Sequence, residues 1–267
     1  MKKILAVSML FLATTSMAAG PFNYTSGTGV KKAGAKEVSF TATSRMGKET
    51  GSYNAQDYYI GGEYGLNNQL QLNVSTGVRS HYISNAMPDY HNLNRNLGFN
   101  GGKVGLKYKF NDNVAVYLGT GYGKIFKTTG DRQDEVAIDL KVFLQKKVGK
   151  NTLAFNINQE FETRKFKGDS DWGHEYNLEL TGGIARPLNN NFKIALETRY
   201  HSEYPEYQKR EHWALFVGPS LSYSKDKLSW AATVLPQITG RPKSGMGSRH
   251  LMEHEKLELR FKVSYEL

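Results

Sequence analysis

The chain has 267 residues, no cysteine and a formal net charge of +10, and its mean hydropathy is −0.54. A helical membrane protein is excluded, because beyond the first twenty residues no run approaches the ~20 apolar residues that a spanning helix needs. The lack of cysteine excludes a disulfide scaffold, a thiolate metal site and a thiol nucleophile. The basic charge alone would suit a nucleic-acid binder, but the N-terminus argues against that interpretation.

The first eighteen residues have the three parts of a secretory signal. Lys2 and Lys3 precede a mostly apolar run over residues 4–13, and the small residues Ser16 and Ala18 follow in an A-x-A-like arrangement. We expect cleavage after Ala18, with the next residue as the alternative, which would lower the net charge by two. Export makes DNA or RNA an unsuitable partner, and we predict no nucleic-acid binding.

The rest of the chain alternates between apolar and polar residues. In the segment 69–78, Leu70, Leu72 and Val74 share one face, while Gln71 and Asn73 share the other. The segments 101–110, 135–148 and 152–165 repeat this period of two, which is typical of strands that are apolar on one face only. No sustained helical stripe follows the signal, so the sequence predicts an all-β protein.

Roughly twelve such segments follow one another, and their connections alternate in length. Short connections are rich in Asn, Asp, Gly and Lys, as in Asn67-Asn68 and Gly149-Lys150-Asn151, and suit tight hairpins. The other connections are longer and polar. The predicted strands cover residues 36–45, 56–66, 69–82, 101–110, 114–126, 135–148, 152–165, 174–187, 192–202, 212–224, 228–240 and 252–267.

An export signal, an even number of strands and alternating connections together resemble the barrels of the bacterial outer membrane. The resemblance implies an antiparallel up-and-down transmembrane barrel of about 12 strands with short periplasmic turns and longer extracellular loops. The organisation is then a cleaved signal at 1–18, an N-terminal periplasmic segment at 19–35 and the barrel at 36–267. An exported lectin-like sandwich or a lipocalin-like barrel is the soluble alternative.

The last predicted strand alternates without a break, with Phe261, Val263, Tyr265 and Leu267 on its outer face. In this strand the chain resembles outer-membrane barrel proteins. The resemblance implies that the strand is the assembly signal for the barrel insertion machinery, because the final strand has that role in those proteins. They usually end in Phe or Trp, from which Leu267 departs. The two final hairpins, including Gly218-Pro219-Ser220, also loosely resemble an uncharacterised family of predicted outer-membrane barrels.

Charged residues fall on the inner face, where they would line the lumen. Two interpretations are open: a cationic ladder along a narrow path for small polar or anionic solutes, or ion pairs that simply hold the interior together. The first predicts a weak anion preference, carried best by Lys103, Lys107 and Lys109 beside Arg79. The full set of pore-lining candidates is Arg79, Lys103, Lys107, Lys109, Lys141, Arg199, Arg260, Lys262, Glu160, Glu197 and Glu258.

The sequence shows no catalytic or metal constellation. His201 and Ser202 are adjacent, so on a strand they point to opposite faces, and His81 follows Ser80 in the same way. On a strand, His250 and His254 would lie ~13 Å apart, too far for one metal ion. We therefore expect no enzyme, metal or cofactor. The alternatives to a channel are a non-conducting structural or adhesive barrel and, less favoured, a lipid-modifying enzyme.

Two further features concern the membrane. Basic residues of the long connections could meet the phosphates of lipopolysaccharide in the outer leaflet; they are Arg132, Lys165, Lys167, Lys209, Arg210, Arg241, Lys243 and Arg249. Pro219 and Pro236 interrupt neighbouring strands, and each removes a ladder donor. A β-bulge would explain the prolines, and a weakened seam in the barrel wall is the alternative.

Overall fold

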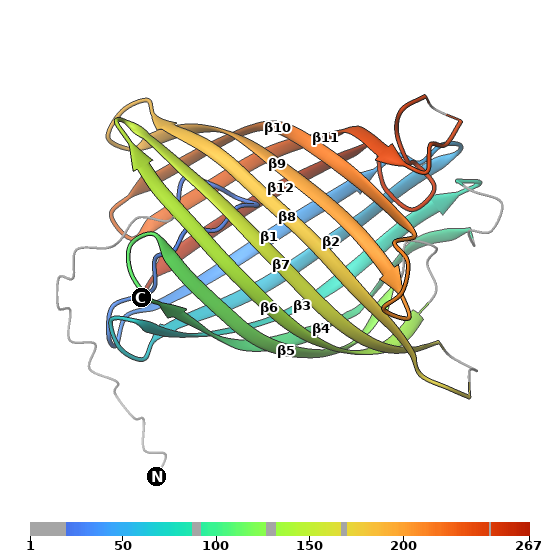
Figure 1. The fold of residues 1–267 in the computed structure, drawn as a ribbon, viewed down its shortest axis with the longest axis horizontal. Coiled ribbons are helices and arrows are strands. Elements are labelled where there is room, and N and C mark those ends of the chain that lie inside the picture. The colour runs from blue at the N-terminus through green and yellow to red at the C-terminus, as the bar shows by residue number, and fades with distance from the viewer. Residues whose placement is uncertain (1–19, 87–91, 127–131, 167–169, 246) are drawn as a thin grey trace, which may run out of the picture.

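A computed structural model describes residues 20–86, 92–126, 132–166, 170–245 and 247–267, and the predicted signal lies outside these residues. The described residues form twelve antiparallel strands that close into one barrel in chain order, with β1 paired to β12 (Figure 1). The all-β, closed-barrel prediction is therefore confirmed. The strands are β1 (Lys36–Met46), β2 (Ser52–Gly65), β3 (Leu70–Ser84), β4 (Leu93–Lys109), β5 (Val114–Phe126), β6 (Arg132–Val148), β7 (Asn151–Phe166), β8 (Gly173–Pro187), β9 (Phe192–Pro205), β10 (His212–Lys225), β11 (Leu228–Arg241) and β12 (Leu257–Glu266).

The predicted strand bounds hold to within a few residues except in two places. β4 begins at Leu93, eight residues before the predicted start at 101. β12 begins at Leu257 and not at 252, because the described residues of the loop 242–256, which are 242–245 and 247–256, precede the strand and pack against the barrel interior. None of the described residues forms a helix long and apolar enough to cross a bilayer.

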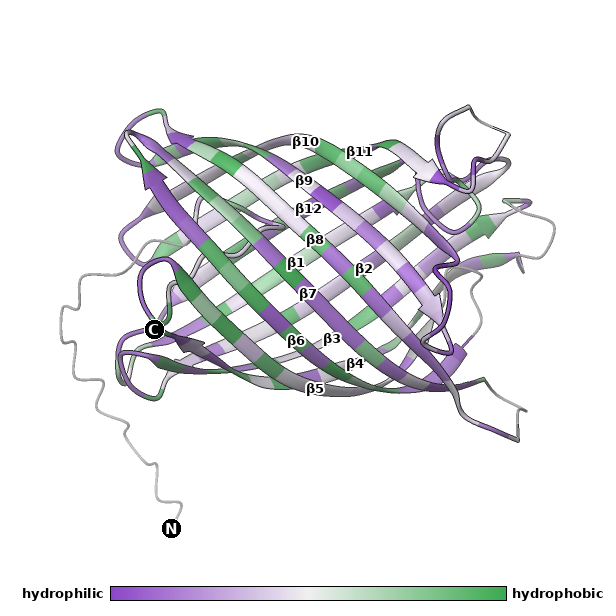
Figure 2. Cartoon of the chain, in the orientation of Figure 1, coloured by the Kyte–Doolittle hydropathy of each residue, from purple (hydrophilic) through white to green (hydrophobic). Residues whose placement is uncertain are grey.

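Alternation decides which side chains face outward. Hydropathy changes from residue to residue along the strands (Figure 2). Large apolar side chains such as Leu118 and Val74 are 61% and 47% exposed, whereas the polar Gln71 and Asn156 are 3% and 1% exposed. The barrel is thus inverted relative to a soluble protein, with apolar residues outside and polar residues inside, as a lipid environment requires.

Small apolar clusters inside the barrel hold the segment that precedes β1. Phe22 packs with Ala154, Ala185 and Ala195. Tyr24 packs with Ala214, Phe216 and Leu235. Because these contacts come from β7 to β11, the segment is fixed to one side of the lumen.

The wall is irregular between β10 and β11. The register shifts between Leu215 and Phe216, and no paired residues join 217–219 of β10 to 234–236 of β11. Pro219 is paired only with Leu196 of β9, and Pro236 only with Leu257 of β12. The predicted irregularity is present, as a register shift beside a gap in the ladder.

Candidate functional site in the barrel lumen

The segment 20–35 enters the lumen from the end of the barrel that carries the short turns, and is drawn in dark blue in Figure 1. Glu197 of β9, which is fully buried, accepts hydrogen bonds from the backbone N–H groups of Asn23 (3.0 Å), Tyr24 (2.8 Å) and Thr25 (2.8 Å). The hydroxyl of Ser220 donates to the same carboxylate. One carboxylate therefore anchors three consecutive residues.

Further contacts carry the segment across the lumen. Asn156 of β7 accepts a hydrogen bond from the backbone N–H of Ser26 at 2.6 Å and donates to its carbonyl oxygen at 2.8 Å. Lys107 of β4 donates to the carbonyl oxygen of Gly27 at 2.7 Å. The guanidinium of Arg260 lies 3.7 Å from the centre of the Tyr24 ring, within the range of a cation–π contact.

These contacts place the segment 20–35, which the sequence predicted to be periplasmic, inside the lumen. Its polar backbone finds buried acceptors and donors on several strands, which is more favourable than leaving those lumen groups without partners. We call residues 20–34 the plug.

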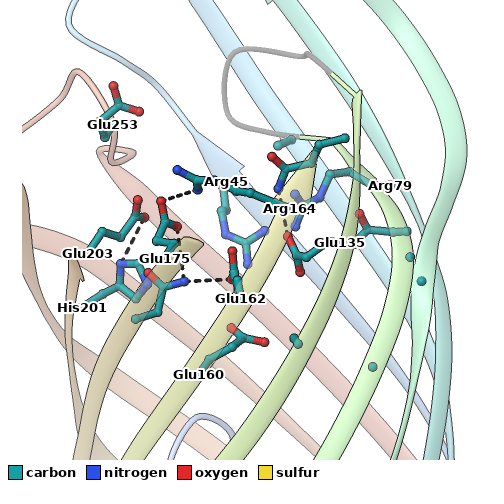
Figure 3. Close-up of a pocket in the computed structure, with 18 of the residues that line it drawn as sticks. Arg45, Arg79, Glu135, Glu160, Glu162, Arg164, Glu175, His201, Glu203 and Glu253 are labelled. Atoms are coloured by element: carbon teal, nitrogen blue, oxygen red, sulfur yellow. Dashed lines mark hydrogen bonds and ion pairs between the residues drawn. The ribbon is translucent and has the colours of Figure 1, made fainter. Parts of the chain in front are cut away.

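Towards the end that carries the longer loops, the lumen widens into a cavity of about 500 Å³, which we call the vestibule. Figure 3 shows carboxylates, arginines and a histidine pointing into it from several strands. Among the described residues, its lining has eight glutamates against five arginines and lysines: Glu135, Glu160, Glu162, Glu175, Glu203, Glu211, Glu253 and Glu255 with Arg45, Arg79, Lys103, Arg164 and Arg199. The vestibule is thus acidic within a protein of net positive charge.

The lysines expected to form a cationic ladder are engaged by other groups. Lys103 donates to Asp139 at 3.2 Å and also to Glu160. Lys107 is held by the plug, and Lys109 pairs with the exposed Asp112 at 2.6 Å. Lys141 lies 3.9 Å from Asp139 and 5.4 Å from the centre of the Tyr117 ring.

The arginine candidates Arg79, Arg199 and Arg260 contact other polar and charged groups, and Arg45 of β1 takes part in the same contacts. Arg45 and Arg79 share Asp57. Arg199 joins Glu179 (2.6 Å) to the fully buried Glu258 (3.1 Å). Arg260 donates to Thr43, and Lys262 is half-buried opposite Thr41 in the register of β1 and β12. Most of the predicted pore-lining residues are therefore in ion pairs with neighbouring side chains.

The loop 242–256, together with the fully buried Lys48, covers part of the vestibule. Lys48 donates to the carbonyl oxygen of Glu253 at 2.7 Å. Gln237 of β11 donates to the carbonyl oxygens of His250 and Glu255, each at 3.0 Å. These contacts hold the loop inside the barrel mouth.

Four histidines meet beneath this loop. His212 Nδ1 and His254 Nε2 lie 3.0 Å apart, and the ring of His212 stacks on that of His250 with centroids 5.1 Å apart. The ring of His201 meets that of His254 edge to face at 5.5 Å. Within the described part of the chain, no group of three or more His, Asp or Glu side chains has a geometry suited to a metal ion.

Burial shifts the pKa of the ionisable groups in this loop region. Desolvation lowers the pKa of His250 to about 4 and that of His254 well below its ordinary value, and the neighbouring histidines add to both shifts. Desolvation also lowers the pKa of Lys48 to about 8. The pKa of Glu255 is raised to about 8 by burial and by the nearby Glu258. Near neutral pH the two loop histidines are therefore uncharged.

Sequence reasoning placed His250 and His254 at the end of the last long connection but did not bring His201 and His212 to them. It also missed Glu135 and Glu175, although both lie at inward positions of alternating segments. The Ser202 hydroxyl donates to the carbonyl oxygen of Leu178 at 3.4 Å and not to His201. In the final strand, Phe261, Tyr265 and Leu267 are exposed on the outer face, and Val263 is half-buried.

The comparison with family models matches residues 18–267 to DUF6662, a family of unknown function. The chain belongs to this family. The search of curated proteins finds no relative.

Solved structures show what the fold resembles. The COG4313 outer membrane channel from Pseudomonas putida F1 is 9% identical, with a TM-score of 0.61 over 90% of this chain and 97% of that one. The beta domain of the Bordetella autotransporter BrkA is 9% identical, with a TM-score of 0.54 over 88% and 99%. The NanC porin is 14% identical, with a TM-score of 0.50 over 86% and 100%.

These likenesses confirm that the fold of this member of DUF6662 resembles outer-membrane barrels. At such low identity they show the fold alone.

Proposed function

We propose that this protein is a narrow channel of the bacterial outer membrane that takes up small polar solutes and is occluded by its own N-terminal segment. The observation that carries the proposal is the division of the lumen into a polar vestibule of about 500 Å³ and a half that the plug fills. A lumen with no path would be filled by side chains throughout, as in the smallest barrels.

The orientation follows from the connections. Barrels of this class carry short turns on the periplasmic side, so the vestibule would face outside and the plug would face the periplasm. Export by the signal at 1–18 and assembly through Phe261, Val263, Tyr265 and Leu267 by the barrel insertion machinery belong to the same proposal.

The predicted preference for anions receives no support from the lysines that were to carry it. A charge that is paired with a neighbouring carboxylate presents little net field to a passing ion. The vestibule has more carboxylates than cationic groups, so we propose that its solutes are neutral or cationic and that anionic solutes are disfavoured.

A non-conducting structural barrel is the second candidate, and the plug is the observation that favours it. At least eight hydrogen bonds would have to break if the plug left the lumen. They join the plug to Glu197, Asn156, Lys107, Asp112 and Gln71. The two candidates differ in whether the plug moves.

A reversible lock on the plug separates them. The chain has no cysteine, so Ser26→Cys with Asn156→Cys introduces one pair at two residues that are hydrogen bonded to each other. In planar bilayers we expect no conductance from the oxidised double variant and stepwise conductance after reduction. The single variants Ser26→Cys and Asn156→Cys are the controls, since neither can form the intramolecular disulfide.

If the reduced variant, the parent protein and a variant lacking residues 20–34 are all silent, the channel is wrong and the structural barrel is supported. Circular dichroism of each variant in detergent establishes that the barrel is folded.

A further inference from the structure

One wall of the vestibule places carboxylates directly opposite one another. Glu162 of β7 and Glu175 of β8 are partners in the strand register, and both are buried. Glu135 of β6 is the register partner of Arg164, two residues further along β7. Like charges at directly opposed positions of a sheet are unfavourable, so the fold bears an electrostatic cost at this wall.

The protein's own side chains offset part of that cost. Arg164 forms an ion pair with Glu175. The amide of Asn177 donates to Glu162 at 2.8 Å and to Glu175 at 3.4 Å, and the amide of Gln133 donates to Glu135 at 2.9 Å. Figure 3 shows Glu135, Glu162, Arg164 and Glu175 gathered on this wall. Three carboxylates, one guanidinium and two side-chain amides thus lie together on this wall.

The two amides provide an independent observation. Carboxylates only accept hydrogen bonds, so Gln133 and Asn177 must turn their NH₂ groups towards the glutamates and their oxygens away from them. Gln133 is 1% exposed and Asn177 is 8% exposed, yet Oε1 of Gln133 and Oδ1 of Asn177 have no hydrogen-bond partner. Buried acceptors without a donor are costly, and both residues line the vestibule.

The next layer of the same wall shows how such a cost can be relieved. Asp139 of β6 and Glu160 of β7 are also directly opposed, two residues further from the mouth. There the ammonium group of Lys103 reaches across from β4 and donates to both carboxylates. An ammonium group carries three donors and one positive charge, which suits a pair of opposed carboxylates.

We propose that the wall formed by Glu135, Glu162 and Glu175, with Gln133 and Asn177, is a binding site for the ammonium group of a small organic cation. A ligand amine would occupy, near the mouth, the role that Lys103 has in the layer below. The inference rests on the proposed channel, for which it names primary amines as the class of solute. Binding of an amine at this site does not itself require conduction.

Isothermal titration of the folded barrel in detergent tests the site with three matched five-carbon probes: cadaverine (1,5-diaminopentane), 1,5-pentanediol and glutarate. We expect cadaverine to bind, and the diol and the diacid to bind at least roughly tenfold more weakly, because hydrogen bonds to charged groups are the stronger ones. Raising the salt concentration should weaken cadaverine binding.

The Glu135→Gln/Glu162→Gln double variant removes two charges while keeping side chains of the same shape, and we expect it to weaken cadaverine binding roughly tenfold or more. The matched control is Glu63→Gln on β2, which lines a separate pocket and should leave binding unchanged. Glutarate that binds as tightly as cadaverine, or a double variant with parental affinity, overturns the inference. Calcium that displaces cadaverine at equal concentration overturns the assignment to amines in favour of a divalent-cation site.

The inference and the channel can fail separately. Cadaverine binding by a barrel that never conducts would support this site and refute the channel. Conductance without cadaverine binding would support the channel and refute this site.

Discussion

The carboxylate of Glu197 accepts the backbone N–H of Tyr24 at 2.8 Å from a residue 173 positions earlier in the chain. It also accepts the N–H groups of Asn23 and Thr25, so a negative charge is held by successive backbone donors, as in an anion-binding nest. Glu197 therefore binds the backbone of the plug, and these hydrogen bonds do not depend on the identity of the plug's side chains.

Replacement of Glu197 by Gln should therefore loosen the plug. The amide retains one acceptor oxygen but presents NH₂ to at least one backbone donor, at a cost of about 1–3 kcal/mol. We expect a lower free energy of unfolding in urea and more frequent openings in planar bilayers. Glu63→Gln is the control, and unchanged gating in Glu197→Gln would show that this carboxylate does not hold the plug.

Replacement of Lys103 by Met should leave Asp139 and Glu160 opposed without their shared cation. Removing one partner from a buried charge cluster is destabilising, by about 1–3 kcal/mol for a hydrogen-bonded charge. We expect lower stability in urea and, because the lumen becomes more negative, a reversal potential shifted towards cation preference. Lys103→Arg should retain most of both properties. A shift towards anions would contradict the described pairing.

Acidification should release the loop 242–256. In the folded loop the pKa of His250 is about 4, below its ordinary value of 6.5. Protons therefore bind the released loop more readily than the folded one, and the folded loop loses stability as the pH falls from 6.5 towards 4. His254 shifts in the same direction. The charged imidazoles of His250 and His254 would then lie near Lys48, His201 and His212. The carboxylates of Glu203 and Glu253 would offset only part of the resulting repulsion.

A fluorophore on Ser248→Cys reports this release, since residue 248 is exposed on the loop. We expect its anisotropy to fall between pH 7 and pH 4 in the parent and to stay level in the His250→Gln/His254→Gln variant. A label on Lys150→Cys, in a short turn, is the control for general loosening. Equal pH responses at residues 248 and 150 would refute a loop-specific effect.

The prolines of the irregular wall make a separate prediction. Pro219 and Pro236 lie within the stretch in which β10 and β11 have no paired residues. Val at both positions adds two backbone donors, so we expect slower hydrogen exchange for the amides of 217–218 and 234–235. Pro187→Val, at the end of β8, is the control. The backbones of Gly218 and Val234 approach so closely that a Cβ at residue 218 would clash with the Val234 carbonyl oxygen. Unchanged exchange would show that this close approach, and not the missing donors, sets the gap.

Lipopolysaccharide binding remains a prediction from the basic residues of the long connections. Lys167 lies outside the described residues, and Arg210 already stacks on Trp213 with its guanidinium 5.9 Å from the ring centroid. We expect the Lys209→Gln/Arg210→Gln/Arg241→Gln/Lys243→Gln variant to co-purify with less lipopolysaccharide, because phosphate contacts are lost. Phosphate analysis of the purified barrel measures this, and an unchanged lipid content would refute the contact.

The sequence determined the barrel because alternation is a local property. Leu70, Val74 and Leu118 can be assigned to the lipid-facing side from their neighbours alone, and so can the inward positions of Glu160, Glu197 and Glu258. The antiparallel order follows as well, since short turns join consecutive strands.

The tertiary structure alone decided the contents of the lumen. The plug has no periodicity, and its partners Asn156 and Glu197 lie 130 and 174 residues away from Ser26 and Asn23. Lys103 meets Asp139 and Glu160 across strands that are not its neighbours, and four histidines from β9, β10 and one loop meet at the mouth. Alternation in the sequence predicts that charged side chains face inward. Only closure of the barrel decides which of them meet, because closure brings together strands that are distant in the chain. A chain with a formal net charge of +10 thus forms a vestibule whose lining has more carboxylates than cationic groups.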